Sequence, residues 1–525
     1  MQIVIPLSGQ GSRFQRAGYT ALKPLIEVEG MPMIEHVVRM FPGESDFLFI
    51  CGQDALETIP ALRPTLERLA PQGKIVGIAP HKRGPVWAAL QAAAWIKDDQ
   101  PVVLNYTDFS VGWDYADFKA TMERENPAGC VTAYRGFHPH SLGPNLYAYL
   151  RHDEATLQMR EIQEKHCFTE NRLQEFASSG TYYFRSGALL KATFHEAVER
   201  DLSTNGEFYA SMPFNLLVEK DEPVRVYELE HFLQWGTPED LEEYLAWSRY
   251  FSHYAEKDGW APELAEMPGT NLIPMAGAGM RFAQEGYKVA KPLVPVDGTP
   301  MIARALRSLP AAKHWIAACR TEHLTSSCLA EYMGQDGRNL TLLPVETLTE
   351  GQACTCLLAR EQIDPEAPLL IAPCDAAFVY DALHYDMLTR SASGPDCLIW
   401  TFQNHPHANR NPKQYGWVAL DETTGNAKTV LCKQAPDGDI RQAHGVIGAF
   451  WFRKAKYFFA AADALIAQNL RVNGEFYVDS SINLLLEQGH TAQVFPVEHY
   501  LCFGVPDDVR TYDYWAGYFA QRARA

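Results

Sequence analysis

The stretch IPLSGQGSRFQRAGYTALKPLIEVEGMPMI at residues 5–34 returns as IPMAGAGMRFAQEGYKVAKPLVPVDGTPMI at residues 273–302. The offset is 268 residues, and the same offset relates the two copies of NGEFY at 205–209 and 473–477. Similarity this extensive indicates a tandem duplication. We therefore predict two domains, residues 1–251 and 271–525. The segment between them, 252–270, is charged, contains proline and glycine, lacks an apolar period, and is predicted to be a linker.

The composition favours a globular protein and argues against nucleic-acid binding. Of the 525 residues, 47% are hydrophobic and 21% are charged, which is ordinary for globular domains. The formal charge is −18, so a nucleic-acid backbone would be repelled. The 11 cysteines include no CxxC pair and are typical of a reducing compartment. No apolar run is long enough to span a membrane. We predict a cytoplasmic protein, and a homo-oligomer is possible.

Short apolar runs alternate with helix-like segments in both halves. The predicted buried strands are 3–7, 47–50, 74–78 and 101–105 in the first half, and 272–275, 315–318, 340–343 and 368–372 in the second. The predicted helical segments include 32–40, 86–97, 300–309 and 353–362. This alternation predicts an α/β fold with a mostly parallel sheet covered on both faces. Aromatic alternation at 180–185 and 448–453 predicts that each sheet is mixed.

The opening loop of each half has the chemistry of a phosphate site. Gly9 and Gly11 allow backbone conformations closed to other residues and a close approach to a phosphate. Successive N–H groups in such a turn form an anion-binding nest. Arg13 adds a planar cationic fork, and Lys23 follows at a position made rigid by the next proline. The predicted loop and cation positions are Ser8, Gly9, Gly11, Arg13 and Lys23, and in the second half Ala276, Gly277, Gly279, Arg281 and Lys291.

SGQGSRF with KPL, and AGAGMRF with KPL, resemble the signature of the sugar-phosphate nucleotidyltransferases, or NDP-sugar pyrophosphorylases, over nearly all of each half. The resemblance implies two tandem Rossmann-like, GT-A-type α/β/α domains. It also implies transfer of a nucleoside monophosphate from a nucleoside triphosphate to a phosphorylated small acceptor, with release of pyrophosphate. Supply of surface-polysaccharide precursors is the use expected of such an enzyme. The loop is not a Walker P-loop, because no Gly-Lys-Ser/Thr follows it.

The resemblance implies a Mg²⁺ cofactor held by an acidic residue at the end of a central strand. Asp108 and Asp375 occupy these positions, and a carboxylate at the carboxyl end of a parallel strand points into the ligand crevice. A turn or helix-capping aspartate is the alternative. The second family ligand is replaced by Gln234 in the first half and by Cys502 in the second. Cys502 is a poor ligand for a hard cation, and the Glu-His pairs at 230–231 and 498–499 are possible substitutes.

Further positions of the family site are implied by the same resemblance. Lys165 and Lys433 match the lysine that contacts the acceptor phosphate, and a solvated surface lysine is the alternative. Gly84 and Gly351 start the helices near the nucleotide base, although neither copy has the usual Gly-Thr-Ala form. The acceptor pocket is implied to include Gly180, Glu207, Gly448 and Glu475. For NGEFY, a helix start with asparagine as N-cap is an equal alternative.

His-Pro-His occurs at 138–140 and again at 405–407. In an extended segment, both imidazoles of each pair would lie on one face and could clamp an anionic acceptor or bind a transition metal. The predicted acceptor-binding histidines are His138, His140, His405 and His407. A rigid polar turn is the slightly favoured alternative.

The duplication leaves three functional hypotheses. Both halves keep the loop, the arginine, the lysine and the aspartate, so two active sites are the simplest. The second half is the better candidate for a regulatory nucleotide- or sugar-phosphate-binding domain, because Cys502 replaces a ligand. A glycosyltransferase of the same fold is the rival enzyme, but neither Asp108 nor Asp375 belongs to an Asp-x-Asp motif. SSGTYY at 178–183 is more polar than VIGAFW at 446–451, which indicates different pocket contents.

Overall fold

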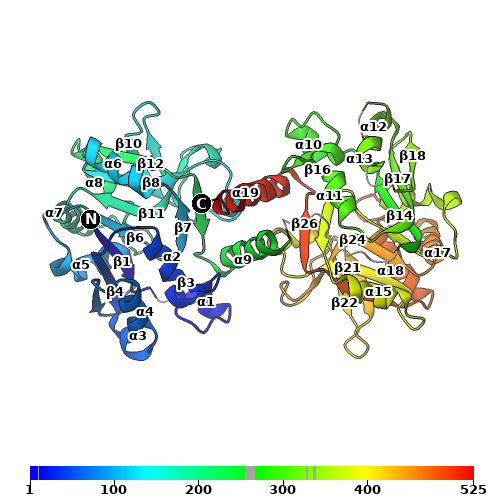
Figure 1. The fold of residues 1–525 in the computed structure, drawn as a ribbon, viewed down its shortest axis with the longest axis horizontal. Coiled ribbons are helices and arrows are strands. Elements are labelled where there is room, and N and C mark those ends of the chain that lie inside the picture. The colour runs from blue at the N-terminus through cyan, green and yellow to red at the C-terminus, as the bar shows by residue number, and fades with distance from the viewer. Residues whose placement is uncertain (10, 255–265, 327–328, 335–337, 525) are drawn as a thin grey trace. The chain divides into compact units, whose positions relative to one another are not determined.

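The computed structural model describes residues 1–9, 11–254, 266–326, 329–334 and 338–524 (Figure 1). The chain divides into two compact units, Met1–Ser248 (unit 1) and Arg249–Ala525 (unit 2). Each unit has its own nine-stranded sheet. Most of the predicted linker, 252–270, lies outside the described residues. However, β14 begins at Met267, so residues 267–270 belong to a strand of unit 2, where they pair with neighbouring strands.

Unit 1 alternates strands and helices along the chain. Its strands are β1 Gln2–Leu7, β2 Glu27–Val28, β3 Met31–Pro32, β4 Phe47–Gly52, β5 Lys74–Ile78, β6 Val102–Asn105, β7 Phe109–Gly112, β8 Gly129–Tyr134, β9 Ala148–His152, β10 Met159–Glu164, β11 Phe176–Phe184, β12 Val224–Glu228 and β13 His231–Gln234. Its helices are α1 Ser12–Arg16, α2 Met33–Arg39, α3 Gln53–Thr58, α4 Leu62–Leu69, α5 Gly84–Gln91, α6 Tyr115–Glu125, α7 Gly187–Glu199, α8 Phe214–Glu219 and α9 Pro238–His253, whose last residues belong to unit 2.

Unit 2 repeats this order. Its strands are β14 Met267–Met275, β15 Pro295–Val296, β16 Thr299–Pro300, β17 Ala312–Arg320, β18 Leu340–Val345, β19 Leu369–Ile371, β20 Ala376–Val379, β21 Cys397–Phe402, β22 Gly416–Leu420, β23 Ala427–Cys432, β24 His444–Phe452, β25 Ala492–Pro496 and β26 His499–Cys502. Its helices are α10 Met280–Gln284, α11 Met301–Arg307, α12 Thr321–Ser326, α13 Leu329–Gly334, α14 Gln352–Leu357, α15 Ala382–Arg390, α16 Pro406–Arg410, α17 Ala455–Ala467, α18 Val478–Glu487 and α19 Pro506–Arg522.

The two sheets have the same strand order. In unit 1, β6, β1, β4 and β5 are mutually parallel neighbours, and β11 runs antiparallel to β6. In unit 2, β19, β14, β17 and β18 repeat the parallel set, and β24 takes the place of β11. The predicted mixed, mostly parallel α/β sheet is confirmed in both halves. The carboxyl ends of the parallel strands therefore lie at one edge of each sheet, where ligands bind in folds of this class.

Helices cover both faces of each sheet, because alternate side chains of the central strands enter different cores. On β1, Val4 packs with residues of α5, α7 and α8, whereas Ile3 and Ile5 pack with residues of α2, α4 and α6. On β14, Leu272 and Ile273 divide between two cores in the same way. Buried strands with apolar residues on both faces are typical of this three-layer arrangement.

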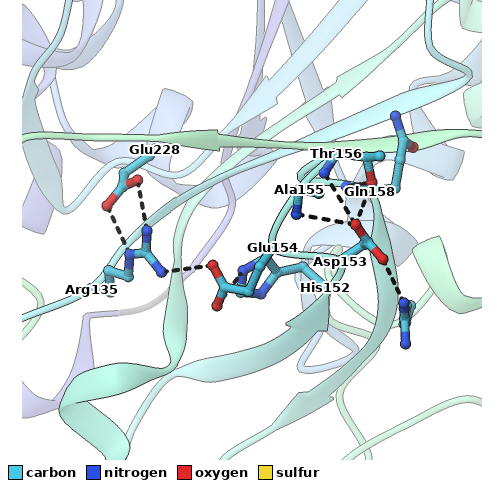
Figure 2. A network of polar contacts seen from close by, with 9 residues as sticks. Arg135, His152, Asp153, Glu154, Ala155, Thr156, Gln158 and Glu228 are labelled. Atoms are coloured by element: carbon cyan, nitrogen blue, oxygen red, sulfur yellow. Dashed lines mark hydrogen bonds and ion pairs between the residues drawn. The ribbon is translucent and has the colours of Figure 1, made fainter.

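The β9–β10 hairpin leads directly into Lys165, a predicted site position, and its turn is held by charged groups (Figure 2). Arg135, directly after β8, pairs with Glu228 on β12 at 3.0 Å and with Glu154 in the hairpin turn at 3.4 Å. Asp153 accepts hydrogen bonds from the backbone of the turn that follows it. These contacts join the turn of the hairpin to the sheet, while Lys165, directly after β10, donates its backbone N–H to the carbonyl of Tyr147 at 2.8 Å.

Candidate active sites in the two units

The glycine loop of each unit packs directly against the lysine of the Lys-Pro-Leu segment that follows it. Gly11 has φ 60°, and a Cβ built on it would lie 3.1 Å from the Cβ of Lys23. Gly279 has φ 61° and makes the same 3.1 Å approach to Lys291. A side chain at either glycine would be strained and crowded. The spacing between glycine and lysine in the two copies therefore reflects a contact between them.

The lysine also pairs with the strand-end aspartate. Lys23 Nζ lies 2.7 Å from Asp108 Oδ2 and donates to the carbonyl of Gly236 at 3.3 Å. In unit 2, Lys291 forms an ion pair with Asp375 and donates to the carbonyl of Gly504 at 3.2 Å. Burial lowers the pKa of Lys291, but the adjacent Asp375 more than offsets this, and the net shift of the Lys291 pKa is upward. The second unit thus holds a charged lysine at this position.

Gln234 lies beside Asp108 because β13 runs antiparallel to β7. Trp235 donates its backbone N–H to the carbonyl of Asp108 at 2.9 Å. A Cβ on Gly236 would lie 2.6 Å from Gln234 Nε2 and 3.2 Å from Asp108 Oδ2, so both side chains converge on the space above this glycine. One carboxylate and one amide fit Mg²⁺ where substrate phosphates supply further oxygen ligands.

In unit 2 the matching space is lined differently. A Cβ on Gly504 would lie 3.4 Å from Cys502 Sγ and 3.8 Å from both Asp375 Oδ2 and Asp508 Oδ2. Burial raises the pKa of the Cys502 thiol well above its usual value, so this side chain is a neutral thiol. Asp508, in the first turn of α19, therefore brings the second carboxylate to this space, and it is a residue that the sequence analysis missed.

The Glu-His pairs do not reach either metal position. His231 begins β13, whereas Gln234 ends it. His231 pairs with Gly112, and Gln234 pairs with Phe109 beside Asp108. In unit 2, Glu498 Oε2 accepts a hydrogen bond from the hydroxyl of Tyr254 at 2.8 Å. Within the described residues, no cluster of three or more His, Cys, Asp or Glu side chains is positioned to hold a metal ion. Any divalent cation here would depend on substrate oxygens.

Two adjacent cavities of unit 1 meet at Lys23 and Asp108. The first, of about 500 Å³, which we call the loop cavity, is lined by Pro6, Leu7, Ser8, Gly9, Gly11, Ser12, Lys23, Pro24, His81, Lys82, Gly84, Pro85, Tyr106, Thr107, Asp108, Glu207 and Tyr209. The second, of about 360 Å³, which we call the lysine cavity, is lined by Gly11, Ser12, Arg13, Phe14, Lys23, Tyr106, Asp108, Leu146, Tyr147, Ala148, Glu164, Lys165, Ser178, Ser179, Gly180, Tyr182, Tyr209, Phe232, Gln234 and Gly236. The predicted loop, cation and strand-end residues are thus gathered around one junction.

His81 orients Ser8 at the wall of the loop cavity. Arg83 donates its backbone N–H to His81 Nδ1 at 3.2 Å, so in the neutral ring the proton is on Nε2. Nε2 lies 3.3 Å from Ser8 Oγ and can donate to it. Burial lowers the pKa of His81, which favours this neutral form. The hydroxyl proton of Ser8 is then available to a ligand in the cavity.

Gly84 is required by the NGEFY motif. It has φ 84°, and a Cβ on it would lie 2.7 Å from the carbonyl oxygen of Phe208. Gly351 of unit 2 makes the same approach to Phe476, with the Cβ position 2.6 Å from that carbonyl oxygen. Phe208 exchanges backbone hydrogen bonds with the start of α5 through Arg83 and Val86. The NGEFY segment therefore forms part of the loop-cavity wall.

The helix-start alternative for NGEFY is wrong. Asn205 and Gly206 have φ values of 54° and 78°, and Thr204 bridges to Glu207. Two consecutive left-handed residues between bridged partners form a tight turn, for which Asn-Gly is the preferred pair. Unit 2 repeats this turn, with Glu475 bridged to Val472. Glu207 lines the loop cavity and is absent from the lining of the lysine cavity.

The lysine cavity places Lys165 beside Tyr209. Lys165 has φ 55°, its Nζ donates to the Tyr209 hydroxyl at 3.1 Å, and its backbone N–H donates to Tyr147. Lys433 has φ 56°, and its Nζ lies 5.5 Å from the ring of Tyr477 and donates to the carbonyl of Gln414. A left-handed lysine is strained, and such strain is concentrated at functional sites. Tyr209 borders both cavities and was singled out in the sequence only as part of the repeated NGEFY.

The first His-Pro-His pair is buried outside these cavities. His138 and His140 are 3% and 8% exposed, and neither lines the loop cavity or the lysine cavity. The Tyr134 hydroxyl lies 2.8 Å from His140 Nε2, and the His140 ring packs against Tyr147 and Phe232. The predicted clamp on an acceptor is therefore corrected for unit 1: these rings support the wall residues from behind.

The second pair has a similar placement. The ring of His405 packs against Phe402 and Tyr500, and burial lowers the pKa of His405 to about 4. His407 Nδ1 lies 2.9 Å from Asp508 Oδ1. His407 thus holds the carboxylate that lies opposite Asp375, and the rigid polar turn describes both pairs better than an acceptor clamp.

Comparisons with known proteins agree with this repeated architecture. Residues 3–241 match the nucleotidyl transferase family, and residues 272–471 match the MobA-like NTP transferase domain family. A nucleoside-diphosphate-sugar pyrophosphorylase from Vibrio cholerae RC9 matches 46% of this chain over 99% of its own, with 19% identity and a TM-score of 0.38. An inositol-1-phosphate CTP transferase from T. maritima matches 48% of this chain over 97% of its own, with 14% identity and a TM-score of 0.38. No curated protein matches the chain.

The two family matches begin in β1 and β14, the strands that precede the glycine loops, and cover residues on both sides of each Lys–Asp pair. The repeat read from the sequence therefore coincides with two nucleotidyltransferase-type domains, which match two different family models. Each half of the chain thus contains a match to a nucleotidyltransferase domain family, and the two matches stand in tandem.

Proposed function

We propose that the protein transfers a nucleoside monophosphate from a nucleoside triphosphate to a phosphorylated small acceptor and releases pyrophosphate. The observation that carries this proposal is the Lys23–Asp108 pair at the junction of two cavities. One cavity is bounded by the glycine loop, and the other contains Lys165. A reaction between two phosphorylated substrates needs this arrangement, in which each has its own cationic cavity and both reach one charged centre.

The roles of the residues follow from their positions. The loop N–H groups and Arg13 bind the triphosphate, and Lys165 binds the phosphate of the acceptor. An acceptor phosphate oxygen attacks the α-phosphorus in line, while the bond from that phosphorus to the bridging oxygen breaks and pyrophosphate takes the electron pair. Lys23 offsets the charge that develops on the α-phosphate, a contribution of the kind that dominates phosphoryl chemistry.

Mg²⁺ is proposed as the cofactor, with Asp108 and the amide oxygen of Gln234 as its protein ligands in unit 1. Bound there, it would neutralise phosphate charge and orient the two substrates. In unit 2, Asp375 and Asp508 would take these roles. Lys23 and Lys291 hold the two strand-end carboxylates in place before any substrate is bound.

A regulatory role for unit 2 is the second candidate. Leu348, Thr349 and Glu350 stand where unit 1 has His81, Lys82 and Arg83, so this segment of unit 2 carries less positive charge. Glu350 is also paired with Arg471 at 2.9 Å. A site with fewer cations binds a triphosphate more weakly. Two catalytic units nevertheless remain the main proposal, because the loop, the lysine and the aspartate are kept.

Three further predictions belong with this proposal. A cytoplasmic location, homo-oligomerisation and supply of surface-polysaccharide precursors are each expected from the sequence or the resemblance. Within the described residues, every helix is too short or too polar to cross a membrane. A glycosyltransferase would instead consume a nucleotide sugar without releasing pyrophosphate from a nucleoside triphosphate.

The test is pyrophosphate release with Mg²⁺ over five nucleoside triphosphates, the four ribonucleotides and dTTP, each with a panel of sugar 1-phosphates and other small monophosphates. Wild type is compared with Asp108→Asn, Asp375→Asn and the double variant, and with Asp99→Asn as an exposed-carboxylate control. We expect each single variant to lose one activity and the double variant to lose both. Retention of every activity in Asp375→Asn would assign unit 2 a regulatory role. No release by wild type with any pair would overturn the transferase proposal.

A further inference from the structure

The lysine cavity of unit 1 contains a carboxylate that unit 2 supplies from another element. Glu164, at the end of β10, lies opposite Ala148 in the β9–β10 register and accepts a hydrogen bond from the hydroxyl of Ser211. At the matching positions of unit 2, Cys432 lies opposite Gly416, and Asp479 takes the place of Ser211. The carboxylate has thus moved from a strand in unit 1 to the first turn of α18 in unit 2.

Glycine in place of alanine at position 416 makes room for the side chain of Asp479. A Cβ on Gly416 would lie 2.4 Å from Asp479 Oδ2, so an alanine there, as at 148 in unit 1, would collide with the carboxylate. Three neighbouring positions therefore differ together, Ala148, Glu164 and Ser211 against Gly416, Cys432 and Asp479. Both units keep a carboxylate near the acceptor lysine, but it comes from the end of a strand in unit 1 and from the first turn of a helix in unit 2.

The wall around this carboxylate also changes from polar to apolar. In unit 1, Ser178 donates to the hydroxyl of Tyr182 at 2.9 Å, and both residues line the lysine cavity. Unit 2 has Val446 and Phe450 at these positions, and both are buried. Cβ of Gly416 would lie 3.4 Å from Val446 Cγ2, which places this apolar side chain next to Asp479.

The space above the central glycine differs as well. A Cβ on Gly180 would lie 2.9 Å from the ring of Tyr106, which lines the lysine cavity. A Cβ on Gly448 would have no atom within 4 Å, and Pro373 stands where unit 1 has Tyr106. The space next to this glycine is therefore occupied by the ring of Tyr106 in unit 1 and is open in unit 2.

We propose that the two units take different phosphorylated acceptors: unit 1 a compact, polyhydroxylated one, and unit 2 a larger one that carries an apolar substituent in place of hydroxyl groups. This inference rests on the proposed function of the lysine cavity as the acceptor site. Hydroxyl groups of the acceptor find partners on Glu164, Ser178 and Tyr182 in unit 1. In unit 2 an apolar substituent fills the space above Gly448, and Asp479 accepts from a remaining donor group.

The direction of the discrimination follows from hydrogen bonding. A site built to pair with a hydroxyl group rejects an analogue that lacks it far more strongly than an apolar site rejects an added methylene, which is worth about 10- to 200-fold. Unit 1 should therefore lose more on deoxygenation of the acceptor than unit 2 does. Burial raises the pKa of both Glu164 and Asp479, in keeping with carboxylates that a ligand donor must satisfy.

The experiment compares the two units in the full-length chain. Lys433→Ala leaves unit 1 as the intact acceptor site, and Lys165→Ala leaves unit 2. Each variant is titrated by calorimetry, and assayed for pyrophosphate release, with a hexose 1-phosphate, its 6-deoxy counterpart and its 2-O-methyl counterpart. For each unit we take the affinity for the substituted acceptor divided by the affinity for the parent acceptor. We expect this ratio to be higher in unit 2 by about tenfold or more. A ratio that differs by less than about threefold between the units, a reversed order, or a unit that binds none of the three would overturn the inference.

A second variant tests the open space directly. Pro373→Tyr in the Lys165→Ala chain should fill the space above Gly448 and weaken binding of the 2-O-methyl compound by about tenfold, while the parent compound binds as before. Pro373→Ala is the matched control, because it leaves the space open. Equal weakening of both compounds would contradict a specific steric effect. Because calorimetry reports binding without turnover, different acceptor preferences without pyrophosphate release would refute the proposed reaction and leave this inference standing.

Discussion

Units 1 and 2 share a strand order and a Lys–Asp pair, yet the residues around that pair differ in matched sets. Ser8 and His81, which contact each other in unit 1, are Ala276 and Leu348 in unit 2. The guanidinium over Phe208 comes from Arg83, whereas the one over Phe476 comes from Arg471. Residues that contact each other have thus changed together in the two units. The shared features are those that the fold and the Lys–Asp pair require, and the exchanged pairs are those that can distinguish the ligands.

The Lys–Asp pair is the feature common to both units, so its removal should have the largest effect. Lys23→Ala should lower the kcat of the unit 1 reaction by about 10²- to 10³-fold, because it removes a preorganised charge from the transition state. Lys291→Ala should do the same for the unit 2 reaction alone. Steady-state pyrophosphate release with the acceptor of each unit measures both. An effect of Lys23→Ala on both reactions would show that the two sites are not independent.

The sequence was sufficient for the features that both units share. The repeat, the strand–helix alternation and the position of Asp108 after a buried strand are encoded locally, and the structure has them where the pattern predicts them. The helix-start alternative for NGEFY failed because Asn-Gly suits both an N-cap and a tight turn. The turn is fixed by contact between Phe208 and Gly84, which are far apart in the sequence.

The features that distinguish the units were not predictable in the same way. Asp508 lies next to Asp375 only because β26 pairs with β20 and returns α19 to the strand end. The carboxylate of Glu164 at the end of a strand is replaced in unit 2 by that of Asp479 at the start of a helix, about 50 residues further along the chain than the matching strand end. No local sequence period relates the two positions, so their proximity could not be predicted. His138 and His140 were singled out by composition, whereas their burial depends on Tyr147 and Phe232 from other segments.

The matched exchange at residues 416 and 479 can be tested by adding one methyl group at Gly416. Gly416→Ala should destabilise unit 2 by about 1–3 kcal/mol, because the new Cβ overlaps Asp479. Asp479→Ser should restore most of that loss in the double variant, since unit 1 combines Ala148 with Ser211. Urea unfolding of the four chains of this double-mutant cycle measures the coupling. Additive effects of the two substitutions would show that the positions did not change together for steric reasons.

His140 tests whether a residue lines the lysine cavity or only packs behind the residues that line it. His140→Phe removes the contact with the Tyr134 hydroxyl and should cost about 1 kcal/mol of stability. The KM for the unit 1 acceptor should stay unchanged, because His140 does not line the lysine cavity. Lys165→Ala is the comparison variant and should raise that KM strongly. A raised acceptor KM in His140→Phe at full folding would return this histidine to the acceptor site.

The smallest expected effect is a pH dependence that both units share despite the moved carboxylate. Burial raises the pKa of Glu164 and of Asp479 in the folded protein, so the unfolded chain releases each proton at a lower pH. Each group therefore contributes stability at low pH that is lost as the pH rises from the unfolded value through the folded one. Glu164→Gln and Asp479→Asn should each reduce the fall in unfolding free energy between about pH 4 and pH 7, whereas Asp99→Asn should not. Urea midpoints at the two pH values measure it. If only one variant shows the effect, the two carboxylates differ in the extent to which burial shifts their pKa. The move from Glu164 to Asp479 would then conserve the carboxylate but not its environment.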